Sequence, residues 1–586
     1  MHPARRFRFP ALLCALAVLF CELIARPYAN MGVCDDGPYI LMARHLANAG
    51  HVVYNGWATA MLGWQLYLGA AFIKVFGFSF ASVRMSTLLV AVVTAWLLQR
   101  TLALAGVNER NATLGTLALA LSPLYLALSA TYMNDIFGLF AVVVCLFGCL
   151  RALQASTERA TVTWLCFAVV TNAVFGTARQ IAWLGILVMV PSALYVLGRR
   201  GAWRTGRRIL WAGGVVTAVG ALFVFACMQW FARQPYSIPE HLAVHGGTAL
   251  NLLSRSFHGF LDLPFLLLPI VALFLPELRK SPRRSFGVGS VALAACALIL
   301  LVLHVTRAGA RPVLEPALGD WVSKYGGFGT MVLTGTPPVF LHADARLVLT
   351  ALSLGGLLGL IASLLDPGPI RPGTEATPPL PWRDLGVLLA PFAVAYTLLL
   401  APRAASLVAL AGGLFDRYLL ELLAVALPCI VRYYQERVQA RLPAVSVLMV
   451  GLTAMYSVVT VHNMFSLYRA RVALAGEFVA RGIPDASVNG GWERNILVEI
   501  RHSGYVNQPH IELPADAYAP APPLPEGTCP MFWGDYTPHI RPVYGVSFDP
   551  DACYGLAPFA PVHYTRWPFL TPGTLYIVRY LPPMKR

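Results

Sequence analysis

The sequence has 586 residues, of which 57% are hydrophobic and only 12% are charged, and its mean hydropathy is +0.63. This composition excludes an assembly of ordinary soluble domains. The net charge of +16 does not indicate a nucleic-acid binder, because the arginines stand in short clusters between apolar runs instead of along one polar face. Many of these runs approach the ~20 residues that a spanning helix needs. We therefore predict an all-α polytopic membrane protein.

The first apolar segment, ALLCALAVLFCELIA, follows the basic stretch MHPARRFRFP. Such a combination is typical both of a secretory signal peptide and of a first spanning helix. We favour an uncleaved helix because no small-x-small cleavage site follows it cleanly. The arginines before it predict a cytoplasmic N-terminus. The next polar stretch, CDDGPY (34–39), then lies on the outer face of the cytoplasmic membrane.

Three apolar stretches lie between these acids and Asp135, at residues 60–77, 85–104 and 113–133. If all three crossed, Asp135 would face the cytoplasm, yet arginines mark the join of the second and third stretches as cytoplasmic. GWQLYLGAAFIKVFG (63–77) is short and has aromatic residues at both ends, as interfacial helices do. We therefore predict an interfacial helix within a first outer loop of residues 27–84, with all three acids on the outer side.

The later basic clusters all fall on the cytoplasmic side when crossings are counted consecutively, which gives about thirteen spanning helices. We predict a membrane domain over residues 1–461. The chain then turns polar and contains short β-like runs such as TLYIVRYL, so residues 462–586 predict a small extracytoplasmic α/β domain. Its Cys529 and Cys553 lie in a polar region, where a disulfide and free thiols are equally compatible with the sequence.

The run DDGPYILMAR, with Asp35, Asp36, Tyr39 and Arg44, resembles the acidic motif of the GT-C superfamily of membrane glycosyltransferases. It is most similar to glycosyltransferase family 39, which includes dolichyl-phosphate-mannose protein mannosyltransferases, and to its aminoarabinose transferase and lipopolysaccharide-core galacturonosyltransferase relatives. The resemblance extends to LSPLYLALSATYMND and FDRYLLELL and covers roughly the first 180 residues well. Asp36 stands where many relatives have Glu. TAMLGWQ replaces their HKPP-type stretch, which puts a metal site there in doubt.

This resemblance implies a GT-C-like fold and transfer of a sugar from a polyprenyl-phosphate donor to an acceptor that is a lipid, a glycan or a protein. A carboxylate would remove the proton of the acceptor hydroxyl while the anomeric carbon is attacked with inversion. We assign that catalytic role to Asp35, which matches the family's first acid. Asp36 is the second catalytic candidate, either by raising the pKa of Asp35 or by fixing the loop.

A phosphate-bearing donor needs cationic partners. Arg44 matches the family's arginine, although an interfacial snorkelling residue would look the same. Arg179 and Arg417 lie at outer helix ends, against the positive-inside trend, and Asp416 is the expected ion-pair partner of Arg417. Lys74 and Arg84 are weaker candidates for the donor phosphate, because an interfacial helix uses cations simply to contact lipid headgroups. The residues predicted to bind substrate are Asp135, Tyr39, Arg44, Arg179, Arg417 and Glu421.

The histidines show no metal-ligand spacing such as HExxH, so we assign no metal ligand, and a divalent metal ion stays open. The alternative function is a transporter of a lipid-linked or small anionic substrate. Such a protein would carry charges at mid-membrane and two similar halves, and no internal repeat is evident. A polytopic scaffold without chemistry is a second alternative. Convergence of the aspartates at an outer cavity would favour the transferase.

Overall fold

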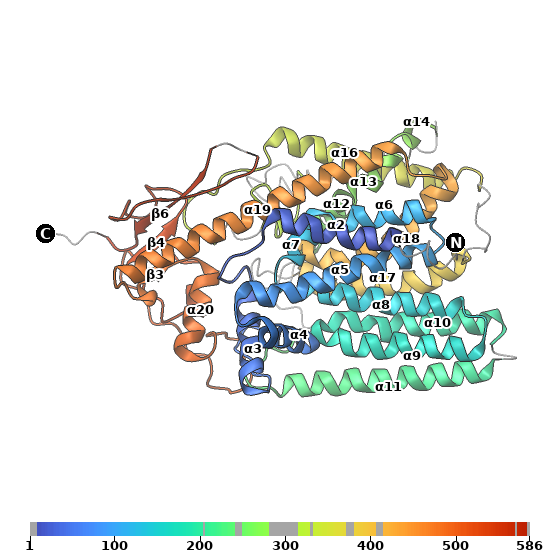
Figure 1. The fold of residues 1–586 in the computed structure, drawn as a ribbon, viewed down its shortest axis with the longest axis horizontal. Helices are drawn as coiled ribbons and strands as arrows, with labels where there is room; N and C mark the ends of the chain where they lie inside the picture. Colours follow the sequence, from blue (N-terminus) through green and yellow to red (C-terminus); the bar gives the residue numbers. More distant parts are fainter. Residues whose placement is uncertain are drawn as a thin grey trace.

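The computed structural model describes residues 9–202, 206–240, 249–280, 287, 314–327, 332–370, 380–405, 414–568 and 571–582. Long helices lie side by side in one bundle, and a small sheet lies at one end of it (Figure 1). The helices that run along the bundle are α2 (Phe9–Ala25), α5 (Phe80–Leu104), α8 (Asp135–Leu153), α9 (Glu158–Phe175), α11 (Arg207–Ala232), α16 (Ala343–Leu365), α17 (Trp382–Ala405) and α19 (Ala444–Ala480).

Two helix pairs of the bundle are bent. Helix α6 (Glu109–Ala120) meets α7 (Pro123–Ser129) at 66°, and α12 (Ala249–Leu266) meets the segment Leu268–Lys280 at 70°. The first bend lies at Ser122 and Pro123, because the serine side chain caps α7 while the proline cannot continue α6. The remaining bundle helices are α10 (Val190–Leu197), α13 (Leu268–Val271), α14 (Glu277–Lys280) and α18 (Leu420–Tyr433).

Eight helical segments of the described residues are long and apolar enough to cross a membrane, and the number is up to ten if each bent pair is one span. The eight include the segment Gln180–Gly201, which contains α10, and do not include the shorter α2. The chain is therefore a multi-pass membrane protein, as predicted. The expected total of about thirteen spans also counted residues 288–313, which lie outside the described residues, and the short helices α2 and α18. That total stays a prediction.

The first outer loop contains two short helices, α3 (Asp36–Ala49) and α4 (Gly63–Phe76). Each has 14 residues, about 21 Å of helix, which is too short for a hydrocarbon core of ~30 Å. Both lie at the end of the bundle that faces the sheet, and α3 lies next to α20 (Trp492–Ser503) (Figure 1). Helix α4 matches the predicted interfacial helix in its bounds, and its position in the membrane interface stays a prediction.

Helix α19 has 37 residues and runs without a break from the bundle toward the sheet (Figure 1). The predicted domain boundary after residue 461 falls inside it. Residues 482–568 and 571–582, hereafter the C-terminal segment, share one buried apolar cluster with the bundle, since Trp492 and Ile577 belong to the same cluster as Leu98. The division into residues 1–461 and 462–586 thus stays a prediction, and the two parts pack against each other.

The C-terminal segment carries a four-stranded sheet in the order β3-β4-β6-β5. Strand β3 pairs parallel with β4, and the other two pairs are antiparallel. The run TLYIVRYL, predicted to be β-like, supplies β6. The strands are β3 (Val488–Asn489), β4 (Tyr544–Ser547), β5 (Val562–Tyr564) and β6 (Gly573–Arg579), and a separate hairpin joins β1 (Val322–Ser323) to β2 (Gly326–Gly327).

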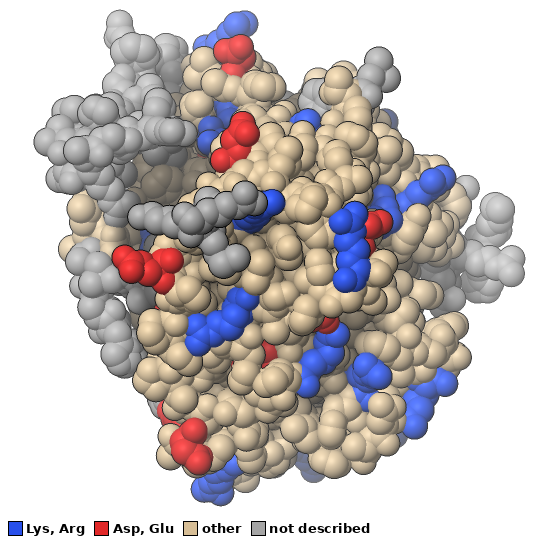
Figure 2. Space-filling view, turned by 90° about the vertical axis from the view of Figure 1, so that its left-hand side faces the viewer, with Lys and Arg blue, Asp and Glu red and all other residues tan. Residues whose placement is uncertain are grey.

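A disulfide joins Cys529 to Cys553 in the C-terminal segment, which decides between the two states that the sequence left open. Figure 2 shows the end of the molecule that carries this segment. On this face the basic and acidic side chains are scattered among uncharged ones, and neither sign forms one continuous patch.

Candidate functional site

Asp35 and Asp36 stand at the start of α3, where a tight turn separates their side chains. Asp35 is the residue that precedes the helix, and Asp36 is its first residue. The backbone of Cys34 has a φ of 55°, in the left-handed region that non-glycine residues seldom adopt. This turn gives the two neighbouring carboxylates different surroundings.

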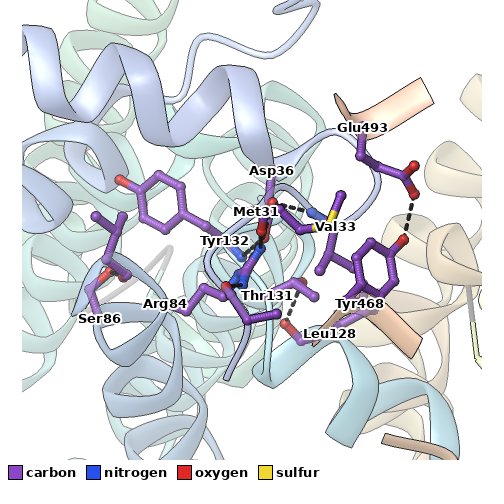
Figure 3. Close-up of polar contacts among 12 residues, drawn as sticks. Met31, Val33, Asp36, Arg84, Ser86, Leu128, Thr131, Tyr132, Tyr468 and Glu493 are labelled. Atoms are coloured by element: carbon purple, nitrogen blue, oxygen red, sulfur yellow. Dashed lines mark hydrogen bonds and ion pairs between the residues drawn. The ribbon is translucent and has the colours of Figure 1, made fainter. Parts of the chain in front are cut away.

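The Asp36 carboxylate is fully buried and accepts four hydrogen bonds (Figure 3). Two come from Arg84, with Nε at 2.7 Å and Nη2 at 3.1 Å. The others come from the backbone N–H groups of Val33, at 2.7 Å, and Tyr132, at 3.2 Å. Asp36 thus joins the outer loop, α5 and the chain before α8. Of its two expected roles, these contacts match the fixing of the loop.

Arg84 was interpreted as a headgroup contact, and that interpretation is wrong. Its side chain is only 3% exposed and also donates to the backbone oxygens of Ala29 and Met31. The sequence interpretation missed this because an arginine near the start of a spanning helix resembles an interfacial residue. Its partner stands 48 positions earlier in the chain.

The Asp35 carboxylate is partly accessible, with 16% of its side chain exposed. Its Oδ1 accepts a hydrogen bond of 3.0 Å from the indole Nε1 of Trp57, and its Oδ2 lies 3.6 Å from Nη1 of Arg417. Burial raises the pKa of Asp35, while Arg417 and the bond from Trp57 act in the opposite direction. Asp35 is therefore a carboxylate that can exchange a proton at a higher pH than an ordinary aspartate.

Asp135 and Glu421 share the guanidinium of Arg179. Asp135, the first residue of α8, forms a buried ion pair with Arg179, and Nη1 of Arg179 is 3.4 Å from Oε1 of Glu421. The Tyr396 hydroxyl donates to Oε2 of Glu421 at 2.9 Å. Oδ2 of Asp135 has no hydrogen-bond partner among the residues that the structure describes. This group is a compact charged cluster beside Asp35.

Arg417 lies in the short helix Asp416–Leu419 and faces Asp35. Its Nε is also 3.9 Å from Oδ2 of Asp320. The expectation that Asp416 pairs with Arg417 is wrong, because the Asp416 carboxylate accepts the backbone N–H groups of Trp321, at 2.9 Å, and Val322, at 2.8 Å. Asp320 was not predicted, since no motif marks it in its loop. Burial raises the pKa of Asp320 to about 6.

The ring of Tyr418 connects the two arginines. The guanidinium carbon of Arg179 is 5.1 Å from the ring centre, and that of Arg417 is 5.5 Å from it. Tyr39 is close enough to Asp35 to be affected by its charge. Burial raises the pKa of Tyr39, and the charge of Asp35 is the next largest cause of this rise. The structure thus brings together most of the predicted residues, namely Asp35, Tyr39, Asp135, Arg179, Arg417 and Glu421.

Arg44 lies outside this group. It is exposed, and its guanidinium carbon stacks 4.4 Å from the ring centre of Phe78. These contacts match the snorkelling alternative. No group of three or more histidine, cysteine, aspartate or glutamate side chains in the described part of the chain is arranged to hold a metal ion. At the site itself, arginines stand between the acids.

The comparisons with known proteins agree with the resemblance that the acidic motif predicts. Residues 64–230 match the family model described as dolichyl-phosphate-mannose-protein mannosyltransferase. No curated protein sequence matches the chain. The chain therefore resembles GT-C glycosyltransferases over the region that follows the acidic motif.

Solved structures resemble the chain over most of its length at low identity and low TM-score. ArnT from Cupriavidus metallidurans bound to undecaprenyl phosphate has 14% identity and a TM-score of 0.39, over 82% of this chain and 83% of that chain. The oligosaccharyltransferase AglB from Archaeoglobus fulgidus, with an inhibitory peptide and a dolichol-phosphate, has 15% identity and a TM-score of 0.39, over 90% and 63%. Arabinosyltransferase EmbB from Mycobacterium smegmatis has 15% identity and a TM-score of 0.32, over 86% and 44%.

Proposed function

We propose that this protein is an inverting glycosyltransferase that moves a sugar from a polyprenyl-phosphate donor to a lipid, glycan or protein acceptor on the outer face of the cytoplasmic membrane. The observation that carries the proposal is the environment of Asp35. It is partly exposed, has a raised pKa and faces an arginine, whereas Asp36 beside it is fully engaged in the fold. The family model supports the donor class, since its description contains a dolichyl-phosphate sugar.

Asp35 acts as the general base. As the anomeric carbon is attacked, its carboxylate takes the proton of the acceptor hydroxyl, and the donor's polyprenyl phosphate leaves with the bonding electrons. A phosphate is a good leaving group, so no strong acid is needed on its side. The hydrogen bond from Trp57 and the charge of Arg417 favour the ionised form of the carboxylate and oppose the effect of its burial.

Arg417 is the better candidate of the two arginines for the donor phosphate. Its guanidinium is 3.6 Å from Asp35 and 3.9 Å from Asp320, so neither carboxylate is within hydrogen-bond distance. Arg179, by contrast, is held in a buried ion pair with Asp135. Bound phosphate would gain charge-assisted hydrogen bonds from Arg417 without breaking a short pair.

The outer-face assignment is supported by the disulfide between Cys529 and Cys553, because disulfides persist in oxidising compartments. The C-terminal segment that contains it packs against the loop that carries Asp35. The proposed reaction therefore takes place on the same side of the membrane as the disulfide. The basic residues between the apolar runs agree with this orientation.

Purified protein supplied with polyprenyl-phosphate sugars is expected to release polyprenyl phosphate and to form a glycoside of inverted anomeric configuration. The measurement is nuclear magnetic resonance of the anomeric proton in the product, with donor and enzyme omitted in turn as controls. A product that keeps the donor's configuration would contradict the single-displacement mechanism. Movement of intact donor across a vesicle membrane without hydrolysis or transfer would favour the transporter.

The rate of transfer is expected to fall as the pH is lowered through the pKa of Asp35, because only the ionised carboxylate can accept a proton. Burial raises that pKa, so the acidic limb should lie above the ~3.9 of an unperturbed aspartate. The measurement is kcat/KM from about pH 4 to about pH 8. A rate that is constant over this range, or that rises toward acid, would show that no raised-pKa carboxylate acts as the base.

A further inference from the structure

Trp57 links Asp35 to the C-terminal segment. It lies in the loop between α3 and α4, and its indole N–H donates to Asp35. The centre of its ring is 4.6 Å from that of Trp492, 5.5 Å from that of Trp533 and 5.9 Å from that of Tyr536. All three of these rings come from the C-terminal segment. The indole that holds the proposed base is thus itself held by residues more than four hundred positions further along the chain.

The backbone beside Trp57 is bound to the same segment. The N–H of Val506 donates to the oxygen of Asn55 at 2.9 Å. Gly56 has a φ of +77°, and a Cβ on it would come within 2.7 Å of the Val506 oxygen, so only glycine fits this approach. The Asn55 amide also donates to the oxygen of Pro38 in α3 at 3.0 Å. The loop that carries Trp57 is therefore fixed on both sides.

Helix α20 of the C-terminal segment also packs on the acidic turn. The side chain of Leu497 packs so closely on Gly37 that a Cβ added to this glycine would lie 3.2 Å from Cδ2 of Leu497. Glu493 is fully buried, accepts a bond of 2.8 Å from Nη2 of Arg471 in α19, and is hydrogen-bonded to the Tyr468 hydroxyl (Figure 3). These bonds fix α20 to α19, and with it Trp492, the first residue of α20 and one of the rings that contact Trp57.

We infer that Trp57 is a positioning residue, through which the C-terminal segment orients the carboxylate of Asp35 for proton transfer. This inference rests on the proposed function. The indole N–H holds Oδ1 at 3.0 Å, while Oδ2 faces Arg417 at 3.6 Å. One carboxylate oxygen is thereby fixed by the indole, and the other lies beside Arg417 without a hydrogen bond to it, so it can accept the proton of the acceptor hydroxyl. A displacement of about 1 Å at a reacting group can cost two orders of magnitude in rate.

The hydrogen bond also affects the protonation of Asp35. A donor to a carboxylate stabilises its charged form, so loss of the indole N–H raises the pKa of Asp35. The other groups that act on Asp35 are Arg417, Cys34 and Asp135, and Asp320 and Tyr39 belong to the same cluster. None of them depends on the indole N–H, so their effects stay the same when only that group is removed.

The test is Trp57→Phe, which keeps an aromatic ring for Trp492 and Trp533 and removes the N–H. We expect kcat to fall about tenfold at neutral pH, KM for the donor to change little, and the acidic limb of the pH–rate profile to move to higher pH. Trp533→Leu leaves the N–H in place but removes a supporting ring. It should shift the same limb in the same direction by a smaller amount. Trp211→Phe, at an indole that is 75% exposed on α11, is the matched control and should behave as wild type.

Asp35→Asn is measured in parallel. If it is inactive while Trp57→Phe and Trp533→Leu keep the wild-type kcat and pH limb, the positioning role is overturned and the proposed base stands. If Asp35→Asn is fully active, the proposed function itself fails. If Trp57→Phe does not fold, the acidic limb of the pH–rate profile is measured for Trp533→Leu alone. A limb at the wild-type position in that variant overturns the inference. A lower rate with an unmoved limb in both variants indicates a purely structural effect and also overturns it.

Discussion

Asp35→Asn is expected to lower the rate of sugar transfer by about 10²–10⁴-fold and to leave the fold intact. The amide is nearly the same size as the carboxylate and can still accept the hydrogen bond from Trp57 through its oxygen. It cannot take up the proton of the acceptor hydroxyl. The measurement is the turnover of a polyprenyl-phosphate sugar donor by the purified variant, with its thermal unfolding recorded alongside.

Asp320→Asn is the matched control for that experiment. The two carboxylates are similarly accessible, with 14% of the Asp320 side chain and 16% of the Asp35 side chain exposed, and both face Arg417. Only Asp35 combines this position with the hydrogen bond from Trp57. We expect Asp320→Asn to lose at most about tenfold, since its 3.9 Å contact is too long for a hydrogen bond. Full turnover by Asp35→Asn, or equal losses in both variants, would remove Asp35 as the base.

Arg84→Met is expected to lower the free energy of unfolding by about 3–5 kcal/mol. It leaves the fully buried carboxylate of Asp36 with only the backbone donors of Val33 and Tyr132. An uncompensated charge in such a place is far more costly than the pair is stabilising. The measurement is thermal unfolding of the detergent-solubilised protein, and the loss of fold should remove activity with it.

Arg100→Met provides the comparison for Arg84→Met. Arg100 lies on the same helix and is 3.3 Å from Glu109, but the two side chains are 23% and 33% exposed. Exposed pairs of this kind contribute about 0–1 kcal/mol, so the unfolding temperature should hardly change. If the two variants are equally stable, the buried pair does not hold the acidic turn, and the role given to Asp36 is wrong.

The features that follow from local rules could be predicted from the sequence. Helix α4 was located within one residue of its bounds, because its length and flanking aromatic residues set it apart from a spanning helix. Counting the membrane crossings also predicted that Asp135 lies on the same side as Asp36. The two residues do lie at the same end of the bundle, where the N–H of Tyr132 donates to the Asp36 carboxylate at 3.2 Å. Charge placement and segment length are properties of short stretches, so they can be interpreted without knowledge of the tertiary packing.

The partners within the site could not be predicted, because they depend on tertiary packing. Asp35 and Arg417 stand almost four hundred positions apart, and no periodicity in the chain relates them. Asp416 was the natural partner for Arg417 by sequence proximity, yet its carboxylate closes the turn at Trp321. Trp57 carried no signal, since a tryptophan in an outer loop is equally compatible with a lipid contact.

The length of α19 has a consequence for how the C-terminal segment can vary. Its 37 residues extend for about 56 Å, of which a hydrocarbon core takes up ~30 Å, so a large part of the helix stands clear of the bilayer. No flexible linker absorbs a change of length there. One inserted residue would turn everything beyond it by about 100° and carry Trp492 away from Trp57, so the height and the rotation of the segment above the bundle are coupled.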